Sequence, residues 1–468
     1  MSLTNASPED AARAAKTSSR RLATLSTNAR NHALDAIHDA LLSAKDAILA
    51  ANAKDLALAK QSAANGDLSP AILKRLDLGR KGKFEDMLQG IRDVRSLEDP
   101  VGRIDLRTEL DSGLILHRQT CPIGVLLIIF EARPEVIANI ASLAIKSANA
   151  AILKGGKESL ESFKAISSVI SSALAPTDVP NDSIQLVTTR DAVEPLLAMS
   201  QYVDLVIPRG SNQLVRYCQE KAHMPVLGHA DGLCNMYIHS DADAQMAVSV
   251  VVDSKCDYPA ACNALEALLV HEDQLETLLP AVATALIVQG VTLRCDPPSL
   301  AALTRHLPKD LSLLVQPATD ADFSTEFLDL ILAIKTIAAT PSDPPACIDA
   351  AIEHINTHGS HHTDAILTAS KAVADHFSNG IDSACKFWNC STRFCDGMRF
   401  GFGTEVGIST NKVHARGPVG LEGLMIHEYR LAGNGQGVAM YGSGGGKRYT
   451  HRRLPLTAEA VQQNGHVA

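Results

Sequence analysis

The sequence has few aromatic residues and no long hydrophobic run. Aromatic side chains make up 4 % of the 468 residues and Trp388 is the single tryptophan, so aliphatic side chains must build the core. The most apolar stretch, residues 124–130, is far shorter than the ~20 residues that a membrane-spanning helix needs. Residues 1–20 lack the apolar centre of a signal peptide. We therefore expect a soluble, cytoplasmic protein without a membrane partner.

Positive charge and paired cysteines are scarce as well. The formal net charge of −9 disfavours nucleic-acid binding, which usually requires a basic surface. The ten cysteines include no CxxC pair, so we expect mostly reduced, buried thiols. The histidine-rich segment 358–364 lacks the HExxH spacing of a metal site and favours a polar substrate loop. The sequence therefore predicts no metal.

The chain is too long for one core, and two or three domains are expected. Within residues 1–95 apolar positions recur at helical spacing. From residue 122, short apolar runs alternate with helical segments, which is typical of a doubly wound parallel sheet. A second α/β unit begins near residue 225. The predicted strands are residues 124–130, 150–153, 184–187, 205–208 and 234–238.

Two segments fall outside these α/β units. Residues 103–121 have apolar positions on both sides of an Asp-Ser-Gly turn, which predicts a β-hairpin. A hairpin outside the helical block suits pairing with another subunit. The tail from residue 433 is rich in Gly, Ser and basic residues, and we expect residues 438–468 to be disordered.

Cys262 is the first candidate for chemistry. It follows a proline-containing loop, and the sequence predicts a helix over residues 263–269. A thiol at a helix N-terminus has its thiolate stabilised by unpaired N–H groups, and the same groups can hold an oxyanion. A buried core cysteine is an equally good interpretation of the spacing alone.

Arg133 lies between a predicted buried strand and a helix that Pro134 begins. In open α/β sheets, ligands bind at the carboxyl ends of the strands, where a guanidinium can hold an anion with two hydrogen bonds. A surface ion pair with Glu131 or Glu135 explains the same residue.

Two further strand-to-helix turns carry phosphate-binding features. Lys154, Gly155 and Lys157 end one strand, where glycine allows close approach of a ligand and lysine offers charge to a cofactor phosphate. Gly210 and Ser211 end another, where the serine either caps the helix or binds a pyrophosphate oxygen. Neither turn has a GxGxxG or Walker motif, and a solvated turn is the alternative for each.

Together these motifs resemble the aldehyde dehydrogenase superfamily and, within it, the gamma-glutamyl phosphate reductase family. The resemblance runs from about residue 10 to about residue 437. Each segment is weak alone, but their order along the chain is specific. The segments are 122–134, 153–158, 207–212, 257–264, 356–364, 391–394, 405–410 and 414–423.

The resemblance implies an aldehyde dehydrogenase-like α/β fold with three parts and a homo-oligomer. A Rossmann-type NADPH-binding domain takes residues 1–102 and 123–224. An α/β catalytic domain takes residues 225–395. A β-hairpin oligomerisation arm takes residues 103–122 and 423–437.

The resemblance also implies a reaction of proline biosynthesis: NADPH-dependent reduction of L-glutamate 5-phosphate to L-glutamate 5-semialdehyde, through a thioester on Cys262. Arg133 aligns with the oxyanion asparagine of the superfamily and is the second catalytic candidate. Glu405 resembles the ligand of the nicotinamide ribose. A glutamate kinase on another chain is a candidate partner. Candidate residues for the amino-acid end of the substrate are Asn356, His361, Ser391 and Arg393.

Two departures from the wider superfamily have a physical meaning. Val226 stands where hydrolytic aldehyde dehydrogenases have the glutamate that activates water, which favours exchange of the thioester with phosphate. Lys157 stands where NAD-dependent relatives tend to have a carboxylate for the ribose hydroxyl, which favours the 2′-phosphate of NADPH.

Two alternatives stay open at this stage. A hydrolytic semialdehyde dehydrogenase would form NADPH from the aldehyde without phosphate, and Val226 argues against it. A non-catalytic oligomeric scaffold would keep the fold alone, and the presence of Cys262, Lys154 and Arg133 argues against that.

Overall fold

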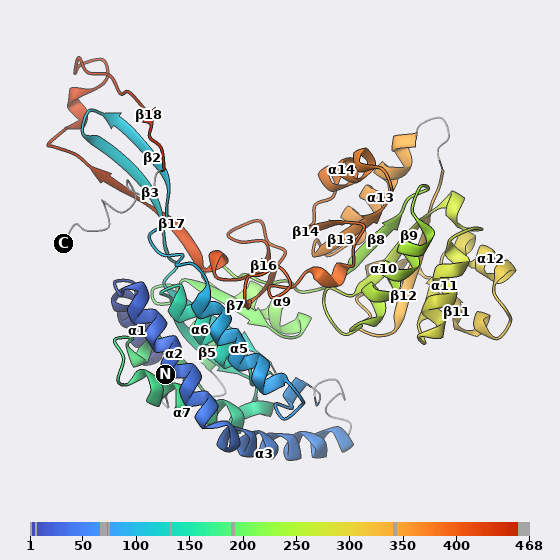
Figure 1. Cartoon of the computed structure of the whole chain (residues 1–468), viewed down its shortest axis with the longest axis horizontal. Helices are drawn as coiled ribbons and strands as arrows, with labels where there is room; N and C mark the ends of the chain where they lie inside the picture. Colours follow the sequence, from blue (N-terminus) through green and yellow to red (C-terminus); the bar gives the residue numbers. More distant parts are fainter. Residues whose placement is uncertain are drawn as a thin grey trace.

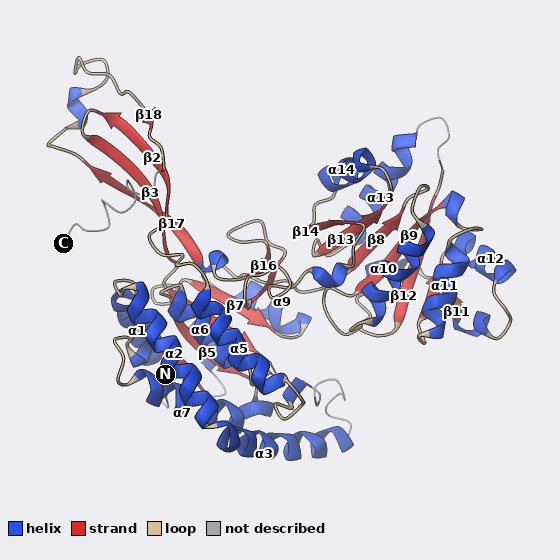
Figure 2. Ribbon diagram, viewed as in Figure 1, coloured by secondary structure: helices blue, strands red, loops and turns tan. Residues whose placement is uncertain are grey.

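The computed structural model describes residues 2–4, 7–65, 73, 75–131, 133–188, 192–339 and 344–456. Two parallel sheets with their helices lie side by side, and an antiparallel sheet projects from the first of them (Figures 1 and 2). Among the described residues no helix is long and apolar enough to cross a membrane.

The first parallel sheet has five strands in the order β1-β6-β5-β4-β7. In that order the strands are β1 (Ser2–Thr4), β6 (Ile184–Val187), β5 (Ala150–Gly155), β4 (Val125–Phe130) and β7 (Leu205–Arg209). All six residues of strand β4, which lies between β5 and β7, are buried, because helices cover both faces of the sheet. A continuous apolar run is the expected sequence of such a strand.

Alternate residues of β4 contact different helical layers, as the two-residue period of a strand requires. Leu126, Ile128 and Phe130 share a core with the helices of one face. Those helices are α2 (Thr27–Ser43), α5 (Lys83–Ser96), α6 (Val136–Lys146) and α7 (Leu160–Leu174), with α3 (Lys45–Ala64) beyond them. Val125 and Leu127 share a second core with the other face. That face carries α1 (Pro8–Leu22), α8 (Val193–Leu197) and α9 (Asn212–Lys221).

The second parallel sheet has seven strands in the order β11-β10-β12-β9-β8-β13-β14. In that order they are β11 (Val315–Pro317), β10 (Thr292–Cys295), β12 (Ile331–Ile337), β9 (Leu265–His271), β8 (Cys234–Ile238), β13 (Thr363–Leu367) and β14 (Cys385–Trp388). One face packs against α10 (Ala244–Cys256), α11 (Leu279–Val288) and α12 (Pro297–His306). The other packs against α13 (Pro344–His358) and α14 (Lys371–Gly380).

The helix predicted over residues 263–269 is wrong. Residues Leu265–His271 form strand β9, between β12 and β8 in the sheet. All seven residues of β9 are buried. An apolar run that is buried on every side has neither a helical nor a strand period, so the pattern alone did not distinguish the two.

The antiparallel sheet has the order β17-β3-β2-β18. The predicted hairpin is present as β2 (Ile104–Asp111) and β3 (Leu114–Pro122), joined at Gly113, whose φ of 69° suits a residue without a side chain. β17 (Met425–Ala432) pairs with β3 along all its residues, and no other described strand pairs with its outer edge. This sheet extends away from the two α/β bodies (Figure 1).

Part of the segment expected to be disordered is placed in the structure. β18 (Arg452–Arg453) pairs with β2, and the Arg452 guanidinium forms an ion pair with Glu109. Strand pairing of this kind needs no apolar face in the tail, which is why composition did not indicate it. Residues 457–468 lie outside the described residues.

Short elements complete the chain. The two-stranded sheet consists of β15 (Gly407–Ser409) and β16 (Gly417–Val419). The 3₁₀ turns are η1 (Lys157–Ser159), η2 (Asn181–Ser183), η4 (Glu272–Gln274), η5 (Leu311–Leu314), η6 (Asp320–Ser324), η7 (Thr392–Phe394), η8 (Glu422–Leu424) and η9 (Val438–Met440).

Candidate active site

Cys262 lies on the loop between helix α10 and strand β9, where it is half-buried. No helix begins at Cys262, so the N–H groups of a first helical turn are not available to its thiolate. The predicted helix N-terminus is therefore wrong as the source of its activation, and side chains near the sulfur are the next candidates.

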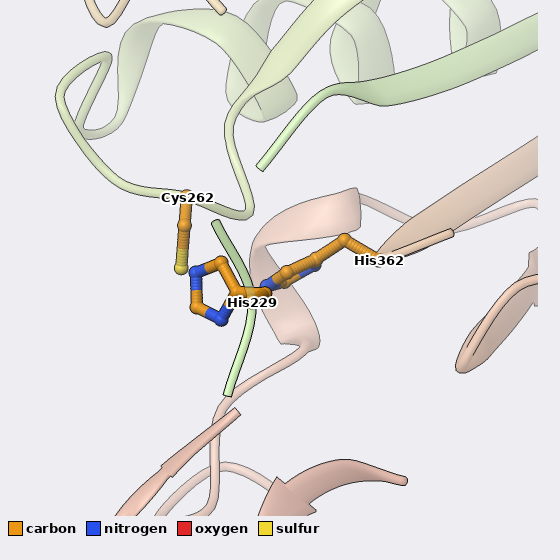
Figure 3. Close-up of side chains that lie close together, drawn as sticks. All are labelled: His229, Cys262 and His362. Carbon is orange, nitrogen blue, oxygen red and sulfur yellow. The ribbon is translucent and has the colours of Figure 1, made fainter. Parts of the chain in front are cut away.

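Two histidines supply such side chains. The ring nitrogens of His229 and His362 and the Cys262 sulfur lie within 4.8 Å of one another (Figure 3). The two rings meet edge to face, with centroids 4.9 Å apart and planes at 79°. Figure 3 shows the Nε2 side of the His229 ring turned toward the sulfur.

The hydrogen bond at the far side of His229 fixes its protonation. Nδ1 lies 2.8 Å from the main-chain oxygen of Ile408. A carbonyl oxygen only accepts, so Nδ1 must carry the proton. In the neutral ring Nε2 is then an acceptor next to the Cys262 thiol.

His362 is fully buried at the start of β13. Its Nδ1 lies 2.9 Å from Thr363 Oγ1 and 3.7 Å from Cys234 Sγ. Its Nε2 has no hydrogen-bond partner among the described residues. A buried nitrogen without a partner is rare in proteins, so this one is available to a group bound at the site.

A second cysteine touches this cluster without sharing its chemistry. The Cys234 thiol donates to the main-chain oxygen of Cys262 at 3.3 Å. Burial raises the pKa of Cys234 well above its ordinary value. Cys234 therefore stays a protonated thiol that supports the loop, and Cys262 is the accessible one of the two.

Gly232 lets another segment approach the Cys262 loop closely. A Cβ atom at this position would lie 2.6 Å from Cys262 Cα, closer than real contacts allow. The Gly232 N–H donates to the carboxylate of Glu326, and burial raises the pKa of Glu326 to about 7. Sequence reasoning missed Glu326, which lies on a loop before β12 with no motif around it.

A pocket of about 310 Å³ holds the charged groups of the site. Its lining includes Arg133, Arg209 and Glu405. Burial and the neighbouring Arg133 lower the pKa of Arg209, while Cys262 and Glu405 lie close enough to oppose that effect. Burial raises the pKa of Glu405, and its Oε2 accepts the Gly397 N–H at 2.8 Å. Two guanidinium groups in one pocket suit a doubly charged anion such as a phosphate.

Comparison with known proteins identifies the chain. The Aldehyde dehydrogenase family profile matches residues 2–292. The chain is 52 % identical over 455 residues to the probable gamma-glutamyl phosphate reductase of Schizosaccharomyces pombe, covering 97 % of this chain and 98 % of that protein. The chain belongs to the gamma-glutamyl phosphate reductases of the aldehyde dehydrogenase family.

Two further reductases agree. The gamma-glutamyl phosphate reductase of Saccharomyces cerevisiae is 46 % identical over 462 residues, 96 % of this chain and 98 % of that protein. The crystal structure of gamma-glutamyl phosphate reductase from Thermotoga maritima matches with a TM-score of 0.84 and 35 % identity, covering 92 % of this chain and 99 % of that one. The resemblance and the fold class are therefore confirmed.

Apart from Glu405, the cofactor-binding residues predicted for this reductase lie at or just after the carboxyl ends of β5 and β7. Lys154 Nζ donates to the Gly155 oxygen at 2.9 Å, and burial lowers the pKa of Lys154. Lys157 is exposed beside it. A Cβ atom at Gly155 would clash with the Phe163 ring. Packing of α7 on the strand therefore explains this glycine without a ligand.

The turn at Gly210 and Ser211, after β7, is partly occupied by the side chain of Glu131. Ser211 caps α9, with its Oγ accepting from the Leu214 N–H. The Ser211 N–H donates to Glu131 Oε2 at 2.9 Å, and the same carboxylate lies close to Gly210. A phosphate that binds this helix N-terminus has to displace Glu131.

Of the predicted substrate residues, Arg393 contacts the Cys262 loop and Ser391 contacts the helix that precedes it. The Arg393 guanidinium contacts both Asp257, at 3.1 Å, and Asn263, so it braces the loop on either side of the cysteine. Ser391 is buried and bonds Ser254 at 3.1 Å.

The other two predicted substrate residues have partners elsewhere. Asn356 bonds the main chain of Gly380 and Asp382 through both polar atoms of its amide, which favours a structural role. His361 adopts a left-handed backbone conformation with φ of 61°, and its oxygen accepts from Ala384. Its neighbour His362, which belongs to the same histidine-rich segment but was not among the predicted site residues, is the one of the two that lies near Cys262.

Proposed function

We propose that the chain catalyses the NADPH-dependent reduction of L-glutamate 5-phosphate to L-glutamate 5-semialdehyde with release of phosphate. The chain is an oxidoreductase, and its relatives are named gamma-glutamyl phosphate reductase. The observation that carries the proposal is the half-buried Cys262 thiol, which lies beside the acceptor Nε2 of His229 and close to Arg209, one of two arginines that line a pocket.

The side chain at position 226 bears on whether water can hydrolyse the thioester. Val226 belongs to the segment that leads to His229, and its oxygen accepts from Asn411 at 2.6 Å. Its apolar side chain packs against the core of the five-stranded sheet. It cannot activate water, so the thioester is left for reduction or for exchange with phosphate.

The residues near β5 fit a phosphorylated nicotinamide cofactor. Lys154 uses its ammonium group only for a neighbouring main-chain oxygen, and Lys157 is exposed with no ion pair among the described residues. Both can turn to phosphate oxygens, and Lys157 suits the 2′-phosphate. Glu405 is proposed to hold the nicotinamide ribose.

The chemistry proceeds on Cys262. His229 Nε2 takes the thiol proton, and the thiolate attacks the acyl carbonyl. Arg133 and Arg209 hold the phosphate or the developing oxyanion. The C–O bond to phosphate breaks, phosphate leaves with the proton that His229 holds, and a thioester remains on Cys262. Bound NADPH supplies a hydride to the thioester carbonyl. The C–S bond then breaks, the aldehyde leaves and the Cys262 thiolate takes up a solvent proton.

Arg393 and Ser391 are proposed to position the amino-acid end of the substrate, with Asn356 and His361 as weaker candidates. The contacts of Arg393 with Asp257 and Asn263 support this, because a carboxylate bound at Arg393 would also fix the loop that carries Cys262.

The antiparallel sheet is proposed to join subunits. Its strand β17 is an edge strand among the described residues and exposes Tyr429 and Leu431, whose relative exposures are 64 % and 56 %. Exposed apolar side chains on an open edge strand favour pairing with another chain. A glutamate kinase remains a candidate partner as the source of the acyl phosphate, and a reduced Cys262 fits a cytoplasmic location.

The reverse reaction tests the proposal. Glutamate 5-semialdehyde and NADP are supplied, and NADPH formation is followed with and without inorganic phosphate. We expect formation only with phosphate, because phosphate must release the acyl group from Cys262. Turnover without phosphate would instead establish hydrolysis, and no turnover under either condition would establish a scaffold without activity.

A further inference from the structure

The cluster of His229, Cys262 and His362 has the composition of a transition-metal site. One ligand atom from each residue lies within 4.8 Å of the other two. Cys262 lies 33 residues after His229 and 100 residues before His362, so no local spacing rule could predict a site here. Their common location before strands β8, β9 and β13 brings them together.

His229 is oriented as a metal ligand normally is. A ligating histidine donates its other ring N–H to a carboxylate, a main-chain oxygen or water, which fixes the tautomer and the ring. His229 makes that bond from Nδ1 to the Ile408 oxygen at 2.8 Å. Nε2 is therefore held toward the sulfur with its lone pair free (Figure 3).

His362 provides an independent observation. Its side chain is fully buried, and Nε2 has no hydrogen-bond partner among the described residues. Its Nδ1 is held by Thr363 Oγ1 at 2.9 Å. The free nitrogen faces the same space as Cys262 and His229, so a cation there would satisfy it.

We propose that His229, Cys262 and His362 bind Zn²⁺, and that the bound ion reversibly blocks the Cys262 nucleophile. One thiolate and two imidazoles suit zinc, whereas Mg²⁺ and Ca²⁺ require oxygen ligands. Zinc bonds of about 2.0–2.3 Å place tetrahedral ligands about 3.5 Å apart, so the three groups close by roughly 1 Å. The fourth position is open to water. Binding releases the Cys262 proton and involves no oxidation.

The inhibitory effect rests on the proposed function of Cys262, but metal binding itself does not. Binding is therefore measured without turnover. The full-length, reduced, metal-free protein is titrated with Co²⁺, whose absorption reports tetrahedral geometry and a thiolate ligand, and with Zn²⁺ against a chromogenic chelator. We expect one site per chain and no response to Mg²⁺.

Variants assign the ligands. We expect His229→Gln and His362→Ala each to weaken zinc binding about ten- to a hundred-fold or more, and Cys262→Ser to remove the cobalt–thiolate absorption. His376→Gln and Cys121→Ser change an exposed histidine and a cysteine of the antiparallel sheet, and they should bind zinc as the original chain does. If the buried His362 variant fails to fold, the half-buried His229 and Cys262 variants carry the test.

The activity assay completes the design. Zinc should inhibit the reductase in competition with the acyl phosphate, protect Cys262 from iodoacetamide, and be reversed by a chelator. Absence of binding, or undiminished binding in the His229 and Cys262 variants, overturns the zinc site. Full turnover by Cys262→Ser would instead overturn the proposed function, even if that variant lost the cobalt–thiolate absorption.

Discussion

The two parallel sheets present opposite ends to the site. Arg133, Lys154 and Arg209 lie at the carboxyl ends of β4, β5 and β7 in the five-stranded sheet. His229, Cys262 and His362 precede β8, β9 and β13, at the amino ends of the seven-stranded sheet. The proposed phosphate-binding residues therefore follow the general rule that ligands bind at the carboxyl ends of parallel strands, whereas the proposed nucleophile departs from it.

This difference divides the chemistry. The carboxyl edge has helix N-termini and lysine and arginine side chains, which suit phosphates. At the amino ends of the seven-stranded sheet no helix begins at Cys262, so we expect an imidazole to take the thiol proton. Anion binding and nucleophilic attack should therefore respond separately to substitution.

The largest effect should follow removal of the nucleophile. We expect Cys262→Ala to lower kcat by at least about a thousand-fold, because no other accessible thiol lies in the site. NADPH affinity, measured by fluorescence titration, should stay within about three-fold of the original value, since the cofactor residues lie on the other sheet. Cys121→Ser is the control and should keep its activity. Lost NADPH binding in Cys262→Ala would mean that the two edges are not separable.

Removal of the proton acceptor should come next. His229→Gln is expected to lower kcat by about 10²–10⁴-fold, the usual contribution of a general base. The KM for NADPH should change little. The rate of Cys262 alkylation by iodoacetamide should fall as well, because the neutral thiol reacts slowly. Normal alkylation with reduced turnover would place His229 later in the reaction than thiol deprotonation.

Cofactor choice tests the opposite edge. We expect Lys157→Asp to lower kcat/KM for NADPH by about 10- to 100-fold, as loss of a charge-assisted hydrogen bond does. Activity with NADH should be retained, because its ribose lacks the phosphate. Lys221→Asp, at the exposed end of α9, is a matched control of equal charge change. Equal losses with both cofactors would show that Lys157 does not contact the 2′-phosphate.

Local patterns predicted the edge that is built from contiguous motifs. Strand β6 has the predicted bounds, and β4, β5 and β7 differ from prediction by one or two residues. Each is a short apolar run between helical segments and turn residues. Lys154 and Lys157 could be found because strand, glycine turn and helix follow one another directly.

The site at the amino ends of the seven-stranded sheet, which holds Cys262, could not be predicted in the same way. Its three side chains belong to separate segments, and the sequence of β9 does not distinguish a helix from a strand, because every residue in it is buried. Glu326 and Arg209 acquire their importance from burial, which sequence spacing does not report. The resemblance predicted Cys262 as the nucleophile, but only the tertiary structure shows that His229 and His362 lie near it.

The smallest predicted effect concerns how far water is excluded from Glu326, near the Cys262 loop. Burial raises the pKa of Glu326 from its ordinary 4.5 to about 7. The folded chain thus holds a proton that the unfolded chain loses, so the free energy of unfolding falls as pH rises from about 4.5 to about 7 and stays lower above. Gln cannot ionise, so Glu326→Gln should be more stable than the original chain at pH above about 7, by about 1–2 kcal/mol after solvent screening.

Urea unfolding at a pH below 4.5 and at one above 7 measures this directly. Glu220→Gln, on the exposed surface of α9, is the matched control and should change stability equally at both values. If Glu326→Gln behaves like that control, the carboxylate of Glu326 is hydrated in the folded chain. Water would then reach the amino ends of the seven-stranded sheet as it reaches the carboxyl ends of the five-stranded sheet. The distinction between a thiol site that excludes water and an anion site that is solvated would be wrong.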